Sequence, residues 1–150
     1  MADDRDLGPM LRGRLTYLLK YALLELDRLH EAHLESFGIN ARELAVLLLL
    51  ADREPESQQQ AAQRLRVDRT TMVGLLDALE AKSLVVRRPD AADRRRNVVE
   101  LTDHGRATLE KATRASDEAE RQLLAGLGEA DAASLRQLLA RIAAGDAVAH

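Results

Sequence analysis

One β-hairpin pattern, set in a chain that otherwise repeats apolar residues at helical spacing, constrains the fold more than any other feature. Residues 84–87 and 97–101 are rich in β-branched side chains, and residues 89–93 between them have the composition of a turn. Three consecutive arginines, residues 94–96, follow the turn at the tip of this hairpin. The sequence therefore predicts a mainly α-helical protein that carries a single small β-hairpin.

The rest of the chain predicts helices with recognisable ends. Residues 7–37 form the longest, with apolar residues on two stripes, and Gly38 suits its C-terminal end. A small domain seldom covers one helix on two sides, so we expect part of this surface to contact a second chain. Later helices are predicted at residues 41–51, 58–65, 68–82, 103–125 and 129–144, with Asn40, Ser57, Asp68 and Thr102 as N-cap residues.

Composition excludes several functional classes. The 150 residues include no cysteine, which rules out disulfide scaffolds, thiolate zinc clusters, thiol nucleophiles and cysteine-based peroxide sensors. The longest apolar run, residues 44–51, is far shorter than the roughly 20 residues that span a bilayer, and the N-terminus lacks a signal-peptide core. Neither a Gly-x-Ser-x-Gly elbow nor a glycine-rich phosphate loop occurs. We expect a cytoplasmic protein that is not an enzyme, needs no cofactor and binds no membrane.

The charge is unevenly distributed along the chain. Residues 57–96 hold nine basic and five acidic residues, a net charge of +4, whereas the whole chain carries −3. The remaining residues therefore carry −7, the total less the charge of this window. A basic middle between acidic ends is typical of a polyanion-binding module on an acidic scaffold. By itself, the pattern equally fits an ordinary solvated charged surface.

The order of the predicted elements gives this charge a structural place. The short helix at residues 58–65, the connection at residues 66–67 and the helix at residues 68–82 form a helix-turn-helix. The hairpin that follows directly has the position of the β-wing in a winged helix. The excess positive charge is concentrated in these same parts, which favours a DNA-binding function.

With these elements in this order, the chain resembles the MarR family of bacterial transcriptional regulators over nearly all of its length. The most specific matches are Val-Asp-Arg-Thr-Thr at 67–71, Leu-Leu-Asp-Ala-Leu-Glu at 75–80 and Leu-Val-Val-Arg at 84–87. The wing keeps the family register, in which Asp93 and Arg95 are two residues apart and Asp93 precedes Leu101 by eight.

This resemblance implies a homodimeric winged-helix protein with one continuous domain, residues 1–150. Residues 40–101 would form the DNA-binding region, and residues 1–37 and 102–150 the helical dimerisation region. The helix at 68–82 would enter the major groove and the wing, residues 87–99, the minor groove. The implied function is a sequence-specific regulator of double-stranded DNA, most often a repressor, on a pseudo-palindromic operator.

The same resemblance indicates individual contacts. Arg69 would present a guanidinium fork to guanine or phosphate, and Asp93 would hold the Arg95 guanidinium in the minor groove. Gly74 would let the helix approach the DNA; the less favoured alternative is a glycine that only weakens the helix. The predicted contacts are Asp68, Arg69, Thr70, Thr71, Val73 and Gly74 on the helix, Asp93, Arg94, Arg95 and Arg96 on the wing, and Gln58, Arg64, Arg66, Lys82, Arg87 and Arg88 to phosphates.

Two positions depart from the family pattern. Ser83 stands where the family usually has glycine, and a left-handed backbone there would be mildly strained with serine. Arg66 stands in the turn of the helix-turn-helix, where glycine is also frequent, and adds a positive charge near the DNA.

A regulatory ligand is a further expectation from the family. Many members bind small phenolic or anionic effectors between the dimer core and the DNA-binding lobe, where Tyr17, Tyr21, His30 and His33 would lie. Ordinary packing explains these side chains as well, and no metal site is predicted. Two alternatives stay open: a winged-helix adaptor for other proteins, and a metal or small-molecule sensor without specific operator binding.

Overall fold

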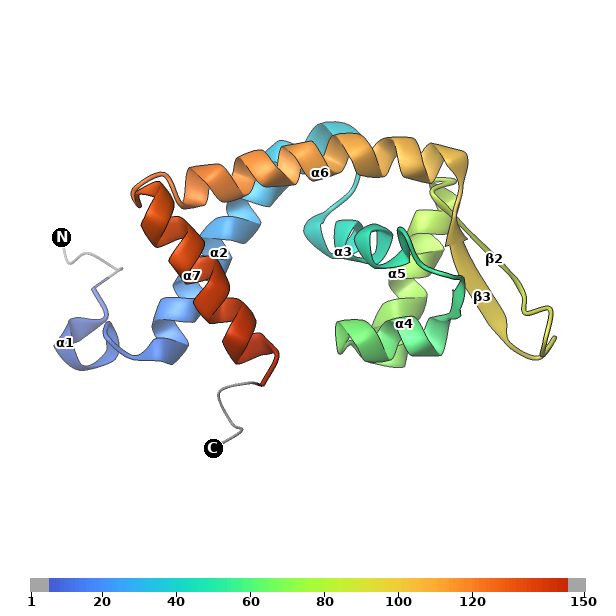
Figure 1. The fold of residues 1–150 in the computed structure, drawn as a ribbon, viewed down its shortest axis with the longest axis horizontal. Helices are drawn as coiled ribbons and strands as arrows, with labels where there is room; N and C mark the ends of the chain where they lie inside the picture. The colour runs from blue at the N-terminus through green and yellow to red at the C-terminus, as the bar shows by residue number, and fades with distance from the viewer. Residues whose placement is uncertain (1–5, 146–150) are drawn as a thin grey trace.

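The computed structural model describes residues 6–145 and has the shape of an arch (Figure 1). Helix α6 crosses the top, α1, α2 and α7 lie at one end, and α3, α4, α5 and the strands lie at the other. The elements are α1 (Gly8–Leu11), α2 (Leu15–Leu34), the 3-10 helix η1 (Glu35–Phe37), α3 (Ala41–Leu50), β1 (Glu56–Ser57), α4 (Gln58–Leu65), α5 (Arg69–Ala81), β2 (Val85–Pro89), β3 (Asn97–Leu101), α6 (Asp103–Leu123) and α7 (Glu129–Ala143).

The prediction of one continuous helix over residues 7–37 is wrong. The chain is extended at Arg14, directly after Gly13, so that α1 is a separate single turn before α2. The last turn tightens into η1, and Gly38 ends it with the left-handed backbone expected there, at φ 67°. The good helix formers on either side of Arg14 hide this break from an argument based on the spacing of apolar residues.

The predicted N-caps are confirmed. The Asn40 side chain accepts a hydrogen bond from the Glu43 N–H, and the Glu43 carboxylate accepts from the Asn40 N–H. Ser57 and Gln60 form the same reciprocal box at the start of α4. Each box satisfies two of the donors that a helix leaves free at its N-terminus, so these ends are set by local sequence.

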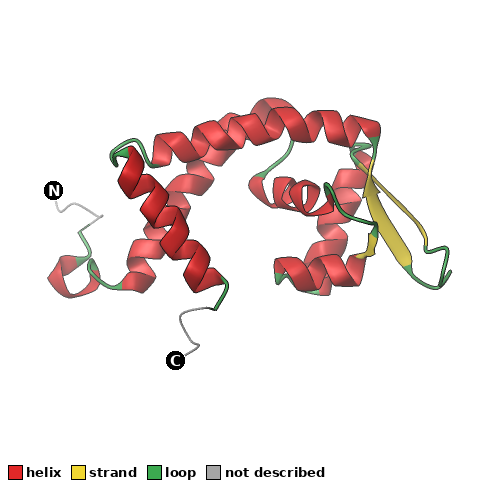
Figure 2. Cartoon of the chain, in the orientation of Figure 1, coloured by secondary structure: helices red, strands yellow, loops and turns green. Residues whose placement is uncertain are grey.

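The strands form a three-stranded antiparallel sheet in the order β1-β3-β2. Val85 pairs with Leu101 and Pro89 with Asn97, so β2 and β3 are the predicted hairpin, and they project from the body as two long arms (Figure 2). The additional strand β1 has only two residues and pairs with β3 through Glu56 and Val99. It ties the start of α4 to the base of the wing.

A hydrophobic core lies within the end of the arch that holds the strands. Val46 and Leu47 of α3, Leu76 and Leu79 of α5 and Val99 of β3 are completely buried there. The first half of α6 closes this core with Leu109 and Ala112. This end of the molecule therefore has the buried interior of a self-contained folding unit.

The opposite end of the arch has a different surface. No described side chain of α7 is buried, and in α2 only Leu29 and Leu34 are. Large apolar side chains with 38–89% of their surface exposed are Met10, Leu15, Leu18, Leu19, Tyr21, Leu23, Leu24, Leu127, Leu135, Leu138, Leu139 and Ile142. So many exposed apolar side chains in one region indicate a surface that binds another protein chain.

Two junctions fix the wing to the helices. The side-chain hydroxyl of Thr102 donates to the Ser83 carbonyl at 2.6 Å, and a Cβ on Gly105 would collide with the Leu84 carbonyl oxygen. Only glycine therefore fits where α6 passes the start of β2. Ser83 has the left-handed backbone discussed for its position, with φ of 61°, and Arg66 is left-handed as well, with φ of 54°. None of the described helices combines the length and apolar character that a bilayer crossing requires.

Candidate nucleic-acid interface

The N-terminus of α5 carries the predicted DNA-reading residues on an exposed surface. Asp68 caps the helix, accepting hydrogen bonds from the Thr71 N–H at 2.6 Å and the Thr71 hydroxyl at 2.9 Å. These two hydrogen bonds lower the pKa of Asp68. Arg69 and Thr70 are exposed, and beside Gly74 there is open space where a side chain would stand. Asp68 and Thr71 thus shape the helix end, while Arg69, Thr70 and Gly74 face outward.

The wing tip is held by hydrogen bonds to the backbone. The Asp90 N–H donates to the Arg96 carbonyl at 2.8 Å, and the Asp93 carboxylate accepts from the Arg95 backbone N–H at 3.1 Å. Within residues 6–145 the two side chains form no ion pair in the DNA-free chain, so the bond between the Asp93 carboxylate and the Arg95 guanidinium stays a prediction for the DNA complex. Asp93 shapes the turn, and the Arg95 guanidinium remains available.

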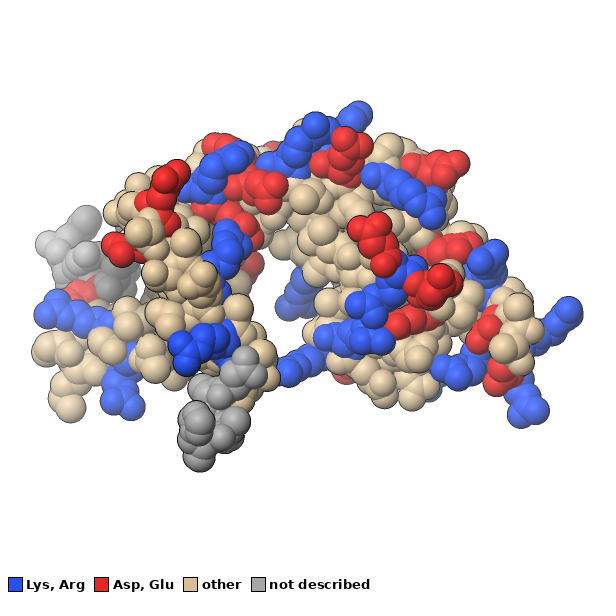
Figure 3. All heavy atoms as spheres, in the orientation of Figure 1, with Lys and Arg blue, Asp and Glu red and all other residues tan. Residues whose placement is uncertain are grey.

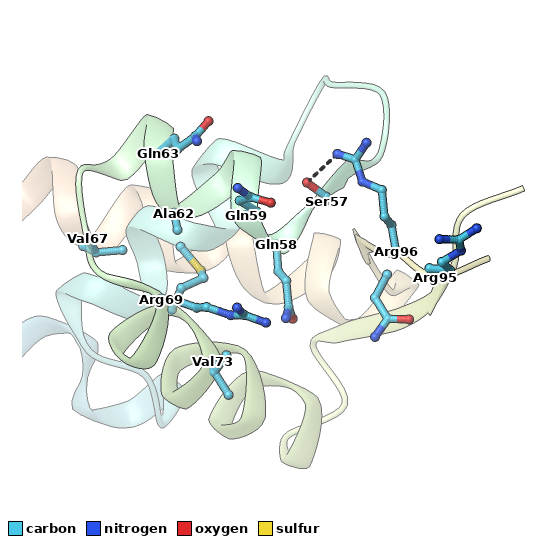
Figure 4. Close-up of a pocket in the computed structure, with 12 residues that line it drawn as sticks. Ser57, Gln58, Gln59, Ala62, Gln63, Val67, Arg69, Val73, Arg95 and Arg96 are labelled. Carbon is cyan, nitrogen blue, oxygen red and sulfur yellow. Dashed lines mark hydrogen bonds between the residues drawn. The ribbon is translucent and has the colours of Figure 1, made fainter. Parts of the chain in front are cut away.

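A cleft of about 490 Å³ lies between α4, α5 and the wing. It is lined by Ser57, Gln58, Gln59, Ala62, Gln63, Val67, Arg69, Met72, Val73, Arg95, Arg96 and Asn97. Figure 4 shows Arg69 and Gln58 extending into it from α5 and α4, while Arg96 bonds the Ser57 hydroxyl at 3.3 Å. Three of the lining residues are arginines and none is acidic, so the cleft attracts anions.

The predicted basic residues divide into two groups. Within residues 6–145, no ion pair involves Arg66, Arg69, Arg94, Arg95 or Arg96, and all five are exposed. Arg64 is paired with Glu56 at 2.7 Å and Arg88 with Glu100 at 3.0 Å. Figure 3 shows Lys and Arg atoms projecting from the wing, whereas blue and red alternate along α6. The first group can meet phosphates without breaking an ion pair within the described residues.

Lys82 and Arg87 take part in structural ion pairs. Lys82, just after the C-terminal end of α5, bonds the Glu43 carboxylate at 2.7 Å, and that carboxylate is only 5% exposed. Arg87, 20% exposed, bridges Asp77 at 2.6 Å and Glu80 at 3.1 Å and so clamps β2 against α5. The bonds to Arg87 lower the pKa of Glu80 and raise that of Arg87. The structure does not bring Lys82 together with Arg69, which lies at the other end of α5.

The predicted effector residues are spread along α2. Tyr17 and Tyr21 stack with ring centroids 6.2 Å apart. His30 bonds the Ser116 hydroxyl at 2.8 Å and His33 the Gln122 amide oxygen at 3.1 Å, so both histidines join α2 to α6. In the described part of the chain, no group of three or more metal-ligating side chains occurs. These four residues thus make contacts along α2 and between α2 and α6, and their part in an effector pocket stays a prediction.

Sequence reasoning missed two polar residues of the cleft, Gln63 and Asn97. Gln59 and Gln63 are four residues apart on α4, a spacing that places two side chains on one helix face. Because Arg69 on the next helix is predicted to contact DNA, this spacing of two glutamines is the sequence signal that could have predicted a polar wall of the cleft. Asn97 gave none, because its position depends on how the wing packs.

The fold and this basic cleft define the class of protein: a winged helix-turn-helix protein. Comparison with known proteins makes this specific. The MarR family profile matches residues 37–96. The transcriptional regulator PecS of Dickeya dadantii is 30% identical over 142 residues, which cover 93% of this chain and 84% of PecS. The repressor NicR of Pseudomonas putida is 38% identical over 68 residues, 45% of this chain and 43% of NicR. This chain belongs to the MarR family of transcriptional regulators.

Solved structures agree with this assignment. A probable transcriptional regulator from Pseudomonas aeruginosa has a TM-score of 0.83 and 31% identity, covering 88% of this chain and 98% of that one. The repressor CouR, bound to a 23-mer DNA duplex, also has a TM-score of 0.83, with 34% identity over 89% of this chain and 94% of CouR. The fold of most of this chain is therefore that of solved transcriptional regulators.

Proposed function

We propose that this chain is a homodimeric repressor that binds a pseudo-palindromic operator in double-stranded DNA. The observation that carries the proposal is the basic cleft between α4, α5 and the wing. Its three arginines, Arg69 on α5 and Arg95 and Arg96 on the wing, form no ion pair within the described residues. The DNA-bound structure of CouR, a repressor of the same fold, supports it.

The site residues follow from this arrangement. The outer face of α5, with Arg69, Thr70 and Gly74, enters the major groove, where a guanidinium fork can bond guanine. Arg95 at the wing tip enters the adjacent minor groove, whose negative potential is strongest where the groove is narrow. Arg94 and Arg96 contact the DNA phosphates beside the minor groove. Because Arg64, Arg87 and Arg88 have acidic partners within the chain, their contribution to phosphate binding is smaller.

The dimer follows from the apolar surface of α1, α2 and α7. Burying the exposed leucines of these helices against a second copy removes them from water. Residues 1–37 and 102–150 then form the dimerisation region and residues 40–101 the DNA-binding region, with residues 1–5 and 146–150 outside the described part. Two binding regions related by a two-fold axis match half-sites about 34–36 Å apart. Such a regulator works in the cytoplasm.

Control by a small molecule is part of the proposal. Among the solved structures, BpsR of Bordetella bronchiseptica is regulated in its DNA binding by 6-hydroxynicotinic acid, and CouR binds p-coumaroyl-CoA. An effector of this chain would have to bind the DNA-free arrangement of the dimer more tightly, because only a difference in affinity shifts an equilibrium.

Fluorescence anisotropy tests the proposal. The full chain is titrated onto a duplex from its own upstream region and onto a scrambled duplex at about 150 mM salt, where screening is cell-like. We expect nanomolar binding to the first and binding weaker by about 1,000-fold to the second. Arg95→Ala should weaken operator binding by at least tenfold with an unchanged melting temperature. Arg114→Ala removes the same charge from α6, where Arg114 is exposed, and should bind as the wild type does.

Two results would contradict the proposal. Equal, weak binding to upstream, scrambled and genomic fragments would favour the adaptor alternative. Wild-type affinity in the Arg95→Ala variant would show that the wing does not enter the minor groove.

A further inference from the structure

One buried polar atom of the cleft has no partner. The amide oxygen of Gln58 is shielded from solvent and accepts no hydrogen bond, and it is the one such side-chain atom among residues 6–145. Leaving a buried acceptor unsatisfied is costly, so native structures rarely do it without a function. The capping box does not explain it, because Ser57 and Gln60 complete that box without Gln58.

Arg69 carries a donor group in the same cleft. Both side chains line the cleft, and Figure 4 shows the end of the Gln58 side chain facing the Arg69 guanidinium. Gln58 is the first residue of α4 and Arg69 the first of α5, so the two helix starts of the helix-turn-helix bring them together. Within the described residues, Arg69 forms no ion pair that would compete.

The chemistry of the two groups is complementary. A guanidinium carries five N–H donors in one plane, and bonding to guanine O6 and N7 uses two of them. At least one remaining donor can bond an amide oxygen while the fork is on the base. An acceptor behind the fork fixes the plane of the guanidinium, and bidentate bonding requires that plane to match the base pair.

We propose that Gln58 is a positioning residue for Arg69: its amide oxygen accepts a hydrogen bond from the guanidinium in the DNA complex and thereby sets a guanine preference at one base pair. This assignment rests on the proposed function. It replaces, for the Gln58 side chain, the phosphate contact predicted from the sequence, because the amide lies within the cleft.

The test is a base-preference profile of the full-length dimer, selected from a duplex library with each operator position varied in turn. Arg69→Ala identifies the base pair that Arg69 reads. Gln58→Ala and Gln58→Met should lose about tenfold of discrimination at that same base pair and keep the preferences elsewhere. The double variant Gln58→Ala/Arg69→Ala should discriminate no worse than Arg69→Ala alone, since the two residues act as one unit.

Two further variants separate positioning from general effects. Gln58→Glu keeps an acceptor oxygen, so it should retain the base preference although its negative charge weakens binding to every sequence. Arg114→Ala, at an exposed side chain of α6 that does not line the cleft, should leave the profile unchanged. Melting curves of all variants should overlay that of the wild type to within a few degrees.

The outcomes that overturn the assignment are distinct. A Gln58→Ala profile that changes at a different base pair from Arg69→Ala, with additive effects, would show that Gln58 contacts a base itself. An unchanged profile would show that Gln58 has no part in discrimination. A wild-type protein without any base preference would overturn the proposed function and this assignment together.

Discussion

The two ends of the arch satisfy their apolar residues in opposite ways. The winged-helix end buries leucines and valines of α3, α5 and β3 within one chain, whereas α7 has no buried side chain among its described residues. Leu47 on α3 has no exposed surface, and Leu138 on α7 is 52% exposed. The first end is thus stabilised by its own core, while the second needs a partner to remove its leucines from water.

This contrast indicates that the chain combines a region that folds around its own core with a region whose apolar surface is buried by a second copy. A change in the winged-helix end should alter the free energy of unfolding or the contact with DNA. A change on the exposed faces of α2 and α7 should instead alter the association of two chains. The following substitutions test that division, from the largest effect to the smallest.

A charge in the apolar surface of α7 should have the largest effect. Leu138→Asp should abolish the dimer, because an aspartate cannot be buried unpaired at an interface. Loss of the second binding region should weaken operator binding by about 100-fold or more. Light scattering after size exclusion measures the mass. Leu48→Asp, at an equally apolar α3 side chain 48% exposed, is the control and should remain dimeric. A dimeric Leu138→Asp variant would contradict the division.

A methyl group at the junction of α6 and β2 should destabilise the winged-helix end. In Gly105→Ala the new Cβ collides with the Leu84 backbone carbonyl, so the backbone must move. We expect a loss of about 3 kcal/mol in the free energy of unfolding, measured by urea denaturation. Gly126→Ala, where nothing lies within 4 Å of the added Cβ, serves as the control. Equal stability of the two variants would show that the junction is not tight.

The same substitution on the DNA-facing side of α5 should have opposite effects on stability and binding. Gly74→Ala meets open space in the free chain and improves helix propensity, so the free energy of unfolding should rise by about 1 kcal/mol. The added methyl should weaken operator binding by about tenfold, equivalent to about 1.4 kcal/mol, because the helix backbone approaches the DNA there. Thermal melting and anisotropy measure the two. Unchanged affinity would mean that Gly74 is merely a helix-weakening residue.

The clamp between the wing and α5 should give a small pH dependence. Arg87 lowers the pKa of Glu80 below its ordinary value of 4.5, so the ion pair stabilises the fold fully above that pH. The stabilisation is lost as the pH falls through the lower, folded-state pKa. Glu80→Gln should lower the melting temperature slightly at pH 7 and flatten its decline between pH 5 and 3, whereas Glu31→Gln on α2 should not. A parallel decline in both variants would contradict the clamp.

Much of the winged-helix end could be predicted because its signals are local. Caps such as Asn40 and Ser57 act within three residues, and the hairpin has its β-branched segments next to its own turn. The break at Gly13 was not predictable from periodicity, because α1 and α2 continue the same apolar pattern. Strand β1 was missed because two residues carry no periodic signal and its pairing partner, β3, lies far along the chain.

For the interface, sequence located the arginines but not their partners. Which of them is neutralised depends on tertiary contacts: Glu56 lies eight residues from Arg64, Glu100 twelve from Arg88 and Glu43 thirty-nine from Lys82. The wing register placed Arg95 correctly at the tip, whereas the function given to Asp93 needed the turn geometry. Residue types and spacing thus predict a DNA-binding site, and the fold decides which side chains are free to act in it.

The unpaired arginines of the cleft and wing have a consequence for how the protein finds DNA. The chain as a whole carries −3, so at long range it is repelled by a polyanion. At physiological salt, charges are screened beyond about 8 Å, a distance shorter than the α6 helix alone, which is roughly 30 Å long. A duplex therefore experiences only the side of the protein that is turned toward it. Residues 57–96 carry a net charge of +4 and the remaining residues −7, so an encounter through the arginines of the cleft and wing is favoured over one through the rest of the chain.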